Sequence, residues 1–313
     1  MSSRVFVAGA SGAIGRPLVR HLVAAGHEVT GMTRREAAAA QIEADGAHGV
    51  VCDVYDRDTL TKAMADGSPE VLVHELTALP DVFDFRDSDL YTATNRVRTE
   101  GTRNLIAAAR EVGVDRVVAQ SIAFVYAPVG SWVKAEDAPV MDEAPGPFGE
   151  ALRAIFDLER QVTGAEGMEG VVLRYGFFYG PATAYARDGY YAGEVRRRRF
   201  PIVGSGEGTF SFTHIEDAAA ATVAACERGA PGIYNVADDD PARMRDWVPA
   251  YAEAVGAKRP LRVPAFLARL VAGRAAAALA TQTRGASNEK AKREFGWRPR
   301  YSSWRQGFRE ALG

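Results

Sequence analysis

The chain has 313 residues, of which 47% are hydrophobic and 25% charged, the proportions of an ordinary globular protein. This length exceeds that of a usual single domain and predicts one large domain with a lobe, or two domains. The formal net charge of −2 gives no reason to expect nucleic acid as a partner.

Apolar runs typical of β-strands alternate with helical patterns through the first half of the chain. The expected strands are 4–8, 28–32, 49–52, 70–74, 115–120 and 170–174, and the expected helices are 13–25, 56–66, 88–112 and 148–163. Strands separated by helices of this length predict a parallel sheet covered on both faces. The expected fold class is therefore α/β, with a doubly wound sheet of the Rossmann type.

The regular alternation ends near residue 180, where Gly-, Pro- and aromatic-rich sequence begins. We expect a dinucleotide-binding domain over residues 1–180, to which the chain returns at about 210–240, and a smaller substrate-binding lobe over 181–313. A ligand cleft is expected between the two.

The first expected strand leads into a glycine-rich turn, in which Gly9, Gly12 and Gly15 are spaced G-x-x-G-x-x-G. Glycines there let the backbone approach a pyrophosphate, and the following helix offers free N–H groups at its N-terminus. The alternative is a tight turn without a ligand, which the strand–turn–helix context disfavours. The other turn residues expected to contact the cofactor are Ser11, Ala13 and Ile14.

The second expected strand ends at Thr33, Arg34 and Arg35. A protein that binds NAD places an acidic residue at this turn to hold the ribose 2′-hydroxyl. No carboxylate stands there to repel a 2′-phosphate, and two guanidinium groups can bind one. The alternative is a pair of solvated arginines. These residues favour NADP(H) over NAD(H) as the cofactor.

Further motifs follow in order along nearly the whole chain. They are CDVYD (52–56), VLVHELTA (71–78), NRVRTEGTRNLIAAAREVGVDRVVAQS (95–121), LRYGFFYGP (173–181), FTHIEDAA (212–219) and FGWRPRYSSWRQGF (295–308). Together with the glycine turn they resemble the extended short-chain dehydrogenase/reductase superfamily, in its epimerase/dehydratase branch. The resemblance implies that Asp53 contacts the adenine. The other cofactor contacts expected from it are Val54, Glu75, Leu76, Thr77, Asn95, Gln120 and Tyr175.

The resemblance also implies a catalytic Ser or Thr, with Tyr and Lys four residues apart on one helix face. In this chain Phe148 and Leu152 stand at the positions of Tyr and Lys. Ile122 stands at the position of Ser or Thr, and Ser121 is one residue early. A misalignment does not explain the loss, because no Tyr-x-x-x-Lys occurs between residues 121 and 170. The usual mechanism is therefore absent.

Two further substitutions concern the substrate. Nucleotide-sugar members of the resembled family hold the diphosphate with an Asn and an Arg, where this chain has Phe177 and Phe210. Phenyl rings would leave that charged group unpaired, so we do not expect a nucleotide-sugar substrate. The aromatic residues instead predict a small, partly apolar or aromatic substrate. Its expected contacts are Ile122, Phe148, Leu152, Phe177, Phe178, Tyr185, Tyr190 and Phe210.

The proton donors that remain near the expected nicotinamide are Tyr126, Tyr179 and Ser121. Tyr126 is the first choice for a catalytic role, because it follows the fifth strand at the expected cleft mouth. The alternative is a hydrogen-bonded tyrosine in the packing. Glu75 is expected beside the cofactor, where it either reaches solvent or acts as a general base.

Two cysteines, Cys52 and Cys226, lie far apart, which favours a reduced cytoplasmic protein. The first strand begins so early that we expect no signal peptide, and the apolar run 266–280 is too short to span a bilayer. The histidines lack metal-ligand spacing. We therefore expect no metal and no membrane partner. The resemblance allows a homodimer built on helices 88–112 and 148–163.

Three functions stay open from the sequence. The first is an NADP(H)-dependent oxidoreductase that acts on a small, largely apolar or aromatic carbonyl or activated alkene through a non-standard proton donor. The second is a redox-neutral isomerase, epimerase or lyase on the same scaffold. The third is a non-catalytic NADP(H)-sensing protein.

Overall fold

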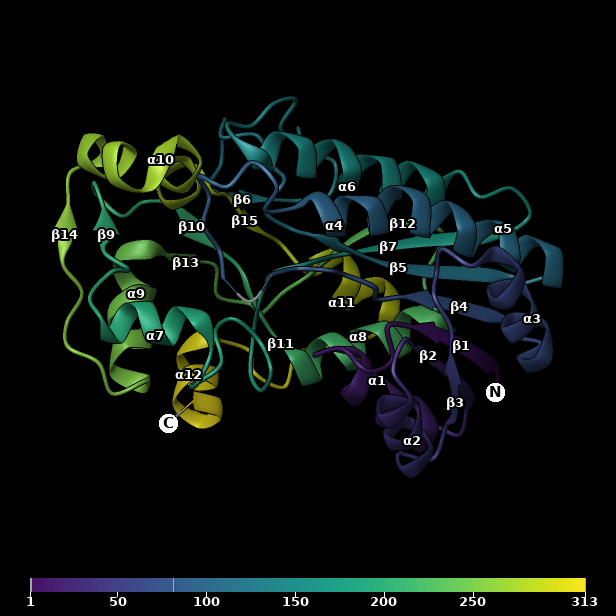
Figure 1. Cartoon of the computed structure of the whole chain (residues 1–313). Helices are drawn as coiled ribbons and strands as arrows, with labels where there is room; N and C mark the ends of the chain where they lie inside the picture. The colour runs from purple at the N-terminus through teal and green to yellow at the C-terminus, as the bar shows by residue number, and fades with distance from the viewer. Residues whose placement is uncertain (1, 81, 313) are drawn as a thin grey trace.

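The computed structural model describes residues 2–80 and 82–312. Its centre is a sheet of seven parallel strands in the order β3–β2–β1–β4–β5–β7–β12 (Figure 1). The strands are β1 (Arg4–Ala8), β2 (Glu28–Thr33), β3 (His48–Val51), β4 (Val71–His74), β5 (Arg116–Ile122), β7 (Glu169–Tyr175) and β12 (Gly232–Val236). The predicted α/β, doubly wound fold is confirmed.

The strand order reverses between β1 and β4. Ligands of such sheets bind outside the carboxyl ends of the strands, at the point of reversal. This places the region of interest at the ends of β1, β4 and β5.

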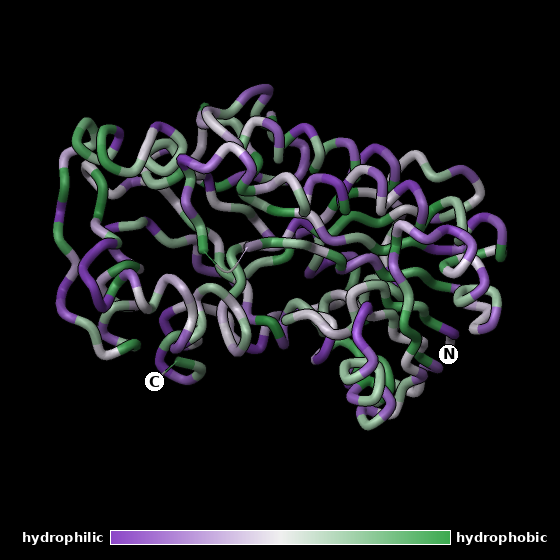
Figure 2. Tube along the Cα trace, viewed as in Figure 1, coloured by the Kyte–Doolittle hydropathy of each residue, from purple (hydrophilic) through white to green (hydrophobic). Residues whose placement is uncertain are grey.

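Helices cover both faces of the sheet (Figure 1). On one face lie α1 (Gly15–Ala24), α2 (Glu36–Ala44), α8 (Ile215–Glu227) and α11 (Glu289–Phe295). On the other lie α3 (Arg57–Gly67), α4 (Thr92–Arg96), the π-helical turn η1 (Val97–Gly101), α5 (Thr102–Val112) and α6 (Pro147–Thr163). The covering helices alternate hydrophobic and hydrophilic residues, as expected when only one face of a helix is buried (Figure 2).

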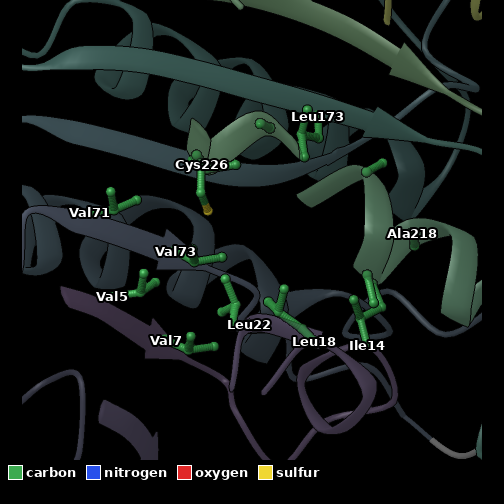
Figure 3. Close-up of a cluster of buried hydrophobic side chains, with 14 of the residues drawn as sticks. Val5, Val7, Ile14, Leu18, Leu22, Val71, Val73, Leu173, Ala218 and Cys226 are labelled. Carbon is green, nitrogen blue, oxygen red and sulfur yellow. The ribbon is translucent and has the colours of Figure 1, made fainter. Parts of the chain in front are cut away.

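Two cores result, because successive side chains of a strand point to opposite faces of the sheet. Val5 and Val7 of β1 join Leu18 of α1 and Ala218 of α8 (Figure 3). Phe6 and Ala8 of the same strand join the core beneath α3, α5 and α6.

A lobe lies at one end of the sheet (Figure 1). It contains the helices α7 (Tyr190–Arg196), α9 (Met244–Ala254), α10 (Ala265–Gln282) and α12 (Trp304–Leu312). Short strands complete the described chain: β6 (Val133–Lys134), β8 (Phe177–Tyr179), β9 (Ile202–Val203), β10 (Thr209–Phe210), β11 (Phe212–His214), β13 (Ala242–Arg243), β14 (Arg262–Val263) and β15 (Gly285–Ala286). The lobe core is rich in large aromatic side chains, among them Phe212, Trp247, Tyr251, Trp304 and Phe308.

Two helical regions differ from the prediction. The helix expected over 88–112 is divided into α4, η1 and α5. Helix α2 was not predicted, because its sequence EAAAAQIEA has no strong apolar stripe and buries only Ala39 and Ile42.

Residues 289–297 were assigned to the lobe from the sequence, but they pack against the sheet. Phe295 of α11 lies on Tyr234 of β12, with ring centroids 4.3 Å apart, and Trp297 joins the same core. Helix α8 also packs there, against α1. The sheet layers therefore include α8, β12 and α11. Within residues 2–80 and 82–312, no helix has the length and apolar character needed to cross a membrane.

Candidate active site

The glycine turn between β1 and α1 brings the backbone of three segments close together. Gly9 has φ of +99°, and a Cβ there would lie 2.8 Å from the backbone carbonyl carbon of Glu75. A Cβ on Gly15 would lie 2.1 Å from the carbonyl oxygen of Gly9. Only glycine fits at these two positions, so the turn packs closely on itself and on the chain after β4, and it forms a compact cradle at the N-terminus of α1. Such a cradle fits the pyrophosphate of a dinucleotide.

A hollow of about 250 Å³ lies beside this turn, at the end of β2. Ser11, Arg16 and Arg35 line it together with α2 residues, and Asp45 is the acidic residue among them. The Ser11 hydroxyl lies 3.0 Å from that of Thr33, which fixes the two loops relative to each other. Arg34 does not line this hollow, whereas Arg16, which the sequence analysis did not single out, does.

The other residues expected at the cofactor come from the glycine turn, the segments after β3 and β4, helix α4 and strand β5. The Asp53 carboxylate accepts a hydrogen bond from the Tyr55 N–H (3.0 Å), and the Val54 carbonyl accepts one from the Asn104 amide (3.0 Å). Asn95 has a buried amide oxygen without a hydrogen-bond partner among the described residues. Three of the expected residues are half-buried: Ala13, Leu76 and Gln120. Ile14 is buried and Thr77 is exposed.

Glu75 and Tyr175 lie buried beneath the glycine turn and contact each other. The Tyr175 hydroxyl lies 3.3 Å from the Glu75 carboxyl and 2.6 Å from the Thr222 hydroxyl, which donates to the Ala218 carbonyl. Burial raises the pKa of Glu75 to about 8, and the hydrogen bond from Tyr175 opposes the shift. The enclosed position therefore favours the protonated form of the Glu75 carboxyl group. The sequence analysis gave two alternative roles for Glu75, a solvent-exposed carboxylate and a general base. This enclosed position matches neither role.

Tyr126 and Ser121 do not lie at a cleft mouth but in a closed polar network. The Tyr126 side chain is 1% exposed, and its hydroxyl donates to Asn235 (2.6 Å) and accepts from Arg174 (3.2 Å). Arg174 forms a buried ion pair with Glu159 (2.6 Å), to which the Ser121 hydroxyl also donates (2.6 Å). Burial raises the pKa of Tyr126. Both hydroxyls are engaged inside the fold, because the buried ion pair needs their hydrogen bonds.

Tyr179 is also enclosed, in the lobe core. Its ring meets that of Phe308 of α12 edge-on at 5.3 Å, and its hydroxyl is buried without a partner among the described residues. Burial raises the pKa of this phenol far above its usual range. None of the three proton donors expected from the sequence is therefore open to a ligand in this structure.

The structure brings together the three apolar residues that the sequence analysis placed at the positions of the family's catalytic triad. Ile122, Phe148 and Leu152 share one apolar cluster at the start of α6 and the end of β5. Leu152 is fully buried, whereas Ile122 and Phe148 are half-buried. This position offers contact surface but no proton.

An aromatic row continues from this cluster; it consists of Tyr91, Phe148, Phe124 and Phe177. Successive ring centroids lie 6.3, 6.3 and 4.2 Å apart, and all four side chains are half-buried. Tyr91 and Phe124 were not identified from the sequence.

The remaining residues expected at the substrate divide between the surface and the core. Phe210 and Tyr185 are enclosed behind Phe177, at 4.8 and 6.2 Å, so they support its ring from the lobe core. Phe178 packs on Tyr175. Tyr190 is half-buried and donates to the carbonyl of Phe83 (3.3 Å), in the loop that follows β4.

The fold and this site define a nicotinamide-dinucleotide protein. Residues 5–237 match the model of the NAD dependent epimerase/dehydratase family, and the chain belongs to that family. The epimerase of UDP-glucose from Thermus thermophilus, whose structure contains NAD, has the same fold: the TM-score is 0.72 at 24% identity, over 99% of this chain and 97% of that one.

The names of two relatives indicate which class of enzyme within the family this chain resembles. A 3-diazoavenalumate denitrifying reductase from a Streptomyces species is 45% identical over 97% of this chain and 98% of its own length. A 4-hydroxy-2-methyl-3-oxo-4-farnesyl-3,4-dihydroquinoline-1-oxide ketoreductase from Stigmatella aurantiaca is 29% identical over 86% of this chain and 78% of its own length. The relatives support an enzyme of the family, and within it an oxidoreductase.

The buried ion pair predicts a large loss of stability on removal of one partner. Glu159→Ala should lower the free energy of unfolding by ~3–5 kcal/mol, because Arg174 would be left as an unpaired buried cation. Tyr126→Phe should lower it by only about 1–2 kcal/mol, because it removes one hydroxyl from the network. Urea unfolding of both variants and the wild type measures the difference. A Tyr126→Phe protein of normal stability without hydride transfer would show that this phenol does reach the substrate.

Glu75→Gln should change how stability depends on pH. The pKa of Glu75 is about 8 in the folded protein against an ordinary value of 4.5, so folding favours the protonated acid. This contribution is complete below pH 4.5 and is lost as the pH rises toward 8. Glutamine does not ionise, so the melting temperature of the variant should rise relative to the wild type between about pH 5 and about pH 8.5. Parallel curves for the two proteins would show that the acid is already ionised when folded.

Proposed function

We propose that the protein is an NADP(H)-dependent reductase that delivers hydride to a small, largely apolar aromatic acceptor. The observation that carries the proposal is the aromatic row, a series of half-buried rings that includes Phe148, the residue expected from the sequence at the position of the family's catalytic Tyr. The 45% identical relative is named a reductase, which supports the direction of the reaction.

The nucleotide end of the site supports NADP(H). Arg16, Arg35 and the Ser11 hydroxyl converge on one hollow, where they would hold a 2′-phosphate. Thr33 replaces the acidic residue that would repel that phosphate. The glycine turn would hold the pyrophosphate. When bound, the reduced nicotinamide supplies a hydride, and the chain's own residues contribute binding and orientation.

The enclosed positions of Tyr126, Tyr179 and Ser121 favour an acceptor whose reduction takes up no proton at the reacting atom. Replacement of a diazonium group by hydride is such a reaction. The C–N bond breaks, a C–H bond forms and N₂ leaves as a neutral molecule, with both electrons of the new bond supplied by the hydride. Because the 45% identical relative is named for a diazo compound, we propose an aromatic diazo compound as the acceptor.

A carbonyl acceptor is the second candidate, favoured by the relative named as a ketoreductase. A ketone needs a proton on its oxygen as well as a hydride. Without a positioned acid the reaction would be slower by ~10²–10⁴-fold. An activated alkene needs a proton at carbon in the same way.

Deuterium transfer tests the proposal. The purified protein would be given NADPH labelled on one face of C4, together with an aryl diazonium salt, an aryl ketone or a conjugated enone. We expect the arene product to carry one deuterium, with one NADPH consumed for each N₂ released. NADPH labelled on the opposite face is the control, because a direct chemical reduction does not distinguish the faces. Deuterium found only in the alcohol formed from the aryl ketone would favour the second candidate, a carbonyl acceptor. Tight NADPH binding without transfer from either face to any acceptor would contradict the proposal and favour a redox-neutral or sensing role.

The hollow at Arg35 predicts cofactor selectivity. Arg35→Gln and Arg16→Gln should each weaken NADPH binding by roughly 10- to 100-fold, because a charge-assisted contact with the 2′-phosphate is lost. NADH binding should change little. Arg20→Gln is the matched control, since Arg20 is an exposed arginine of α1 outside the hollow. Calorimetric titration with both nucleotides measures the effect. An equal loss of affinity for NADH and NADPH would show that these arginines do not bind the 2′-phosphate.

A further inference from the structure

Arg98, in the π-helical turn η1, is a buried cation that has no counter-charge among the residues that the structure describes. The residue is 9% exposed. Within residues 2–80 and 82–312, its guanidinium has no carboxylate within 4.0 Å and donates no hydrogen bond. A guanidinium removed from water is strongly destabilising unless an anion or an acceptor compensates it. Its position therefore requires a partner that these residues do not provide. Turns of the π type often occur at functional sites.

The neighbouring histidine does not provide that partner. His74, the last residue of β4, accepts a hydrogen bond from the Leu76 N–H (3.2 Å) at Nδ1. Its Nε2 lies 3.0 Å from the Thr102 hydroxyl, which itself donates to the Arg98 carbonyl (2.6 Å). Nε2 must therefore carry the proton and donate. Burial, reinforced by the Arg98 charge, lowers the pKa of His74 to about 4, so the ring is neutral at pH 7.

Tyr91 adds a second donor beside Arg98. Its hydroxyl has no hydrogen-bond partner among the residues that the structure describes, and it interacts electrostatically with Arg98. Burial raises the pKa of Tyr91 to about 12, with Arg98 opposing the shift, so the phenol keeps its proton. The ring belongs to the aromatic row, 6.3 Å from that of Phe148. Among the described residues, Arg98 and Tyr91 are thus two donors without acceptors, and Tyr91 borders the surface proposed for the substrate.

We propose that Arg98 and Tyr91 form a binding site for an ionised oxygen of the substrate, either a carboxylate or a phenolate. The proposal rests on the function proposed above and adds the substrate's charge to it. The aromatic row holds the apolar part of the molecule, and the guanidinium and phenol donate to its anionic oxygen. Burial lowers the pKa of Arg98 to about 10, so the cation persists at neutral pH.

Binding of simple probes tests this site without any turnover. The resonances of benzoate, benzamide and 4-nitrophenol would be followed by NMR during titration with the protein, with and without NADP⁺. We expect benzoate, or ionised 4-nitrophenol, to bind about tenfold or more tightly than its neutral counterpart. The arm that shows the larger preference identifies the oxygen as carboxylate or phenolate. A wild-type protein that binds neutral and anionic probes equally would overturn the proposal.

The variants assign the preference to residues. Arg98→Gln should abolish the preference for the anion and Tyr91→Phe should reduce it, whereas Arg98→Lys should keep most of it because the charge is retained. Arg110→Gln, an exposed arginine on α5, is the matched control and should bind as the wild type does. If Arg98→Gln weakens NADPH binding but leaves the anion preference intact, the cation serves the cofactor and the proposal is wrong. A retained anion preference together with failed deuterium transfer would contradict only the proposed reaction.

Discussion

The buried ion pair between Glu159 and Arg174 is the interaction on which the site depends most. It joins α6 to β7 and engages Ser121 of β5, while Tyr126 connects it to Asn235 of the edge strand β12. Two charges removed from water are stable only when their remaining hydrogen-bonding groups are satisfied. The hydroxyls at the ends of the strands are therefore turned inward, toward the pair. The half-buried side chains near the end of β5, Ile122 and Phe124, are apolar. Phe124 belongs to the aromatic row.

The nucleotide end follows from a different constraint, the close approach of the backbone around the glycine turn. Because Gly9 lies against the chain after β4 and Gly15 lies against Gly9, the start of α1 is held close to the sheet. That closeness places Arg16 beside the end of β2, within reach of the hollow that Arg35 lines. Two arginines from different segments can thus act on one phosphate. The electrostatics of the hollow are a consequence of backbone packing as much as of residue type.

The fold could be predicted from the sequence because strand and helix periodicities in a doubly wound sheet are strong local signals. The turn at the glycines could be predicted as well, since it depends on spacing along one segment. The direction in which a side chain points could not be predicted from the sequence. Tyr126 follows β5 and Tyr179 ends β8, yet each hydroxyl lies inside the fold, because its environment comes from segments distant in sequence. Arg98 was missed for a related reason: the run 88–112 was interpreted as a single helix, whereas a π-helical turn interrupts it.

The absence of the catalytic triad that the sequence predicts and the proposed cationic site fit one chemistry. A reaction that protonates an oxygen needs a donor with an adjustable pKa, and the family's Tyr and Lys provide it. A reaction that replaces a leaving group by hydride needs instead an acceptor held still against an apolar surface. For such an acceptor a bound anionic oxygen is useful in two ways: it anchors the molecule by a charge-assisted hydrogen bond, and it leaves the reacting carbon among rings that exclude water. Tyr91 packs on Phe148 and interacts electrostatically with Arg98, so one phenol takes part in both the apolar surface and the proposed anion site.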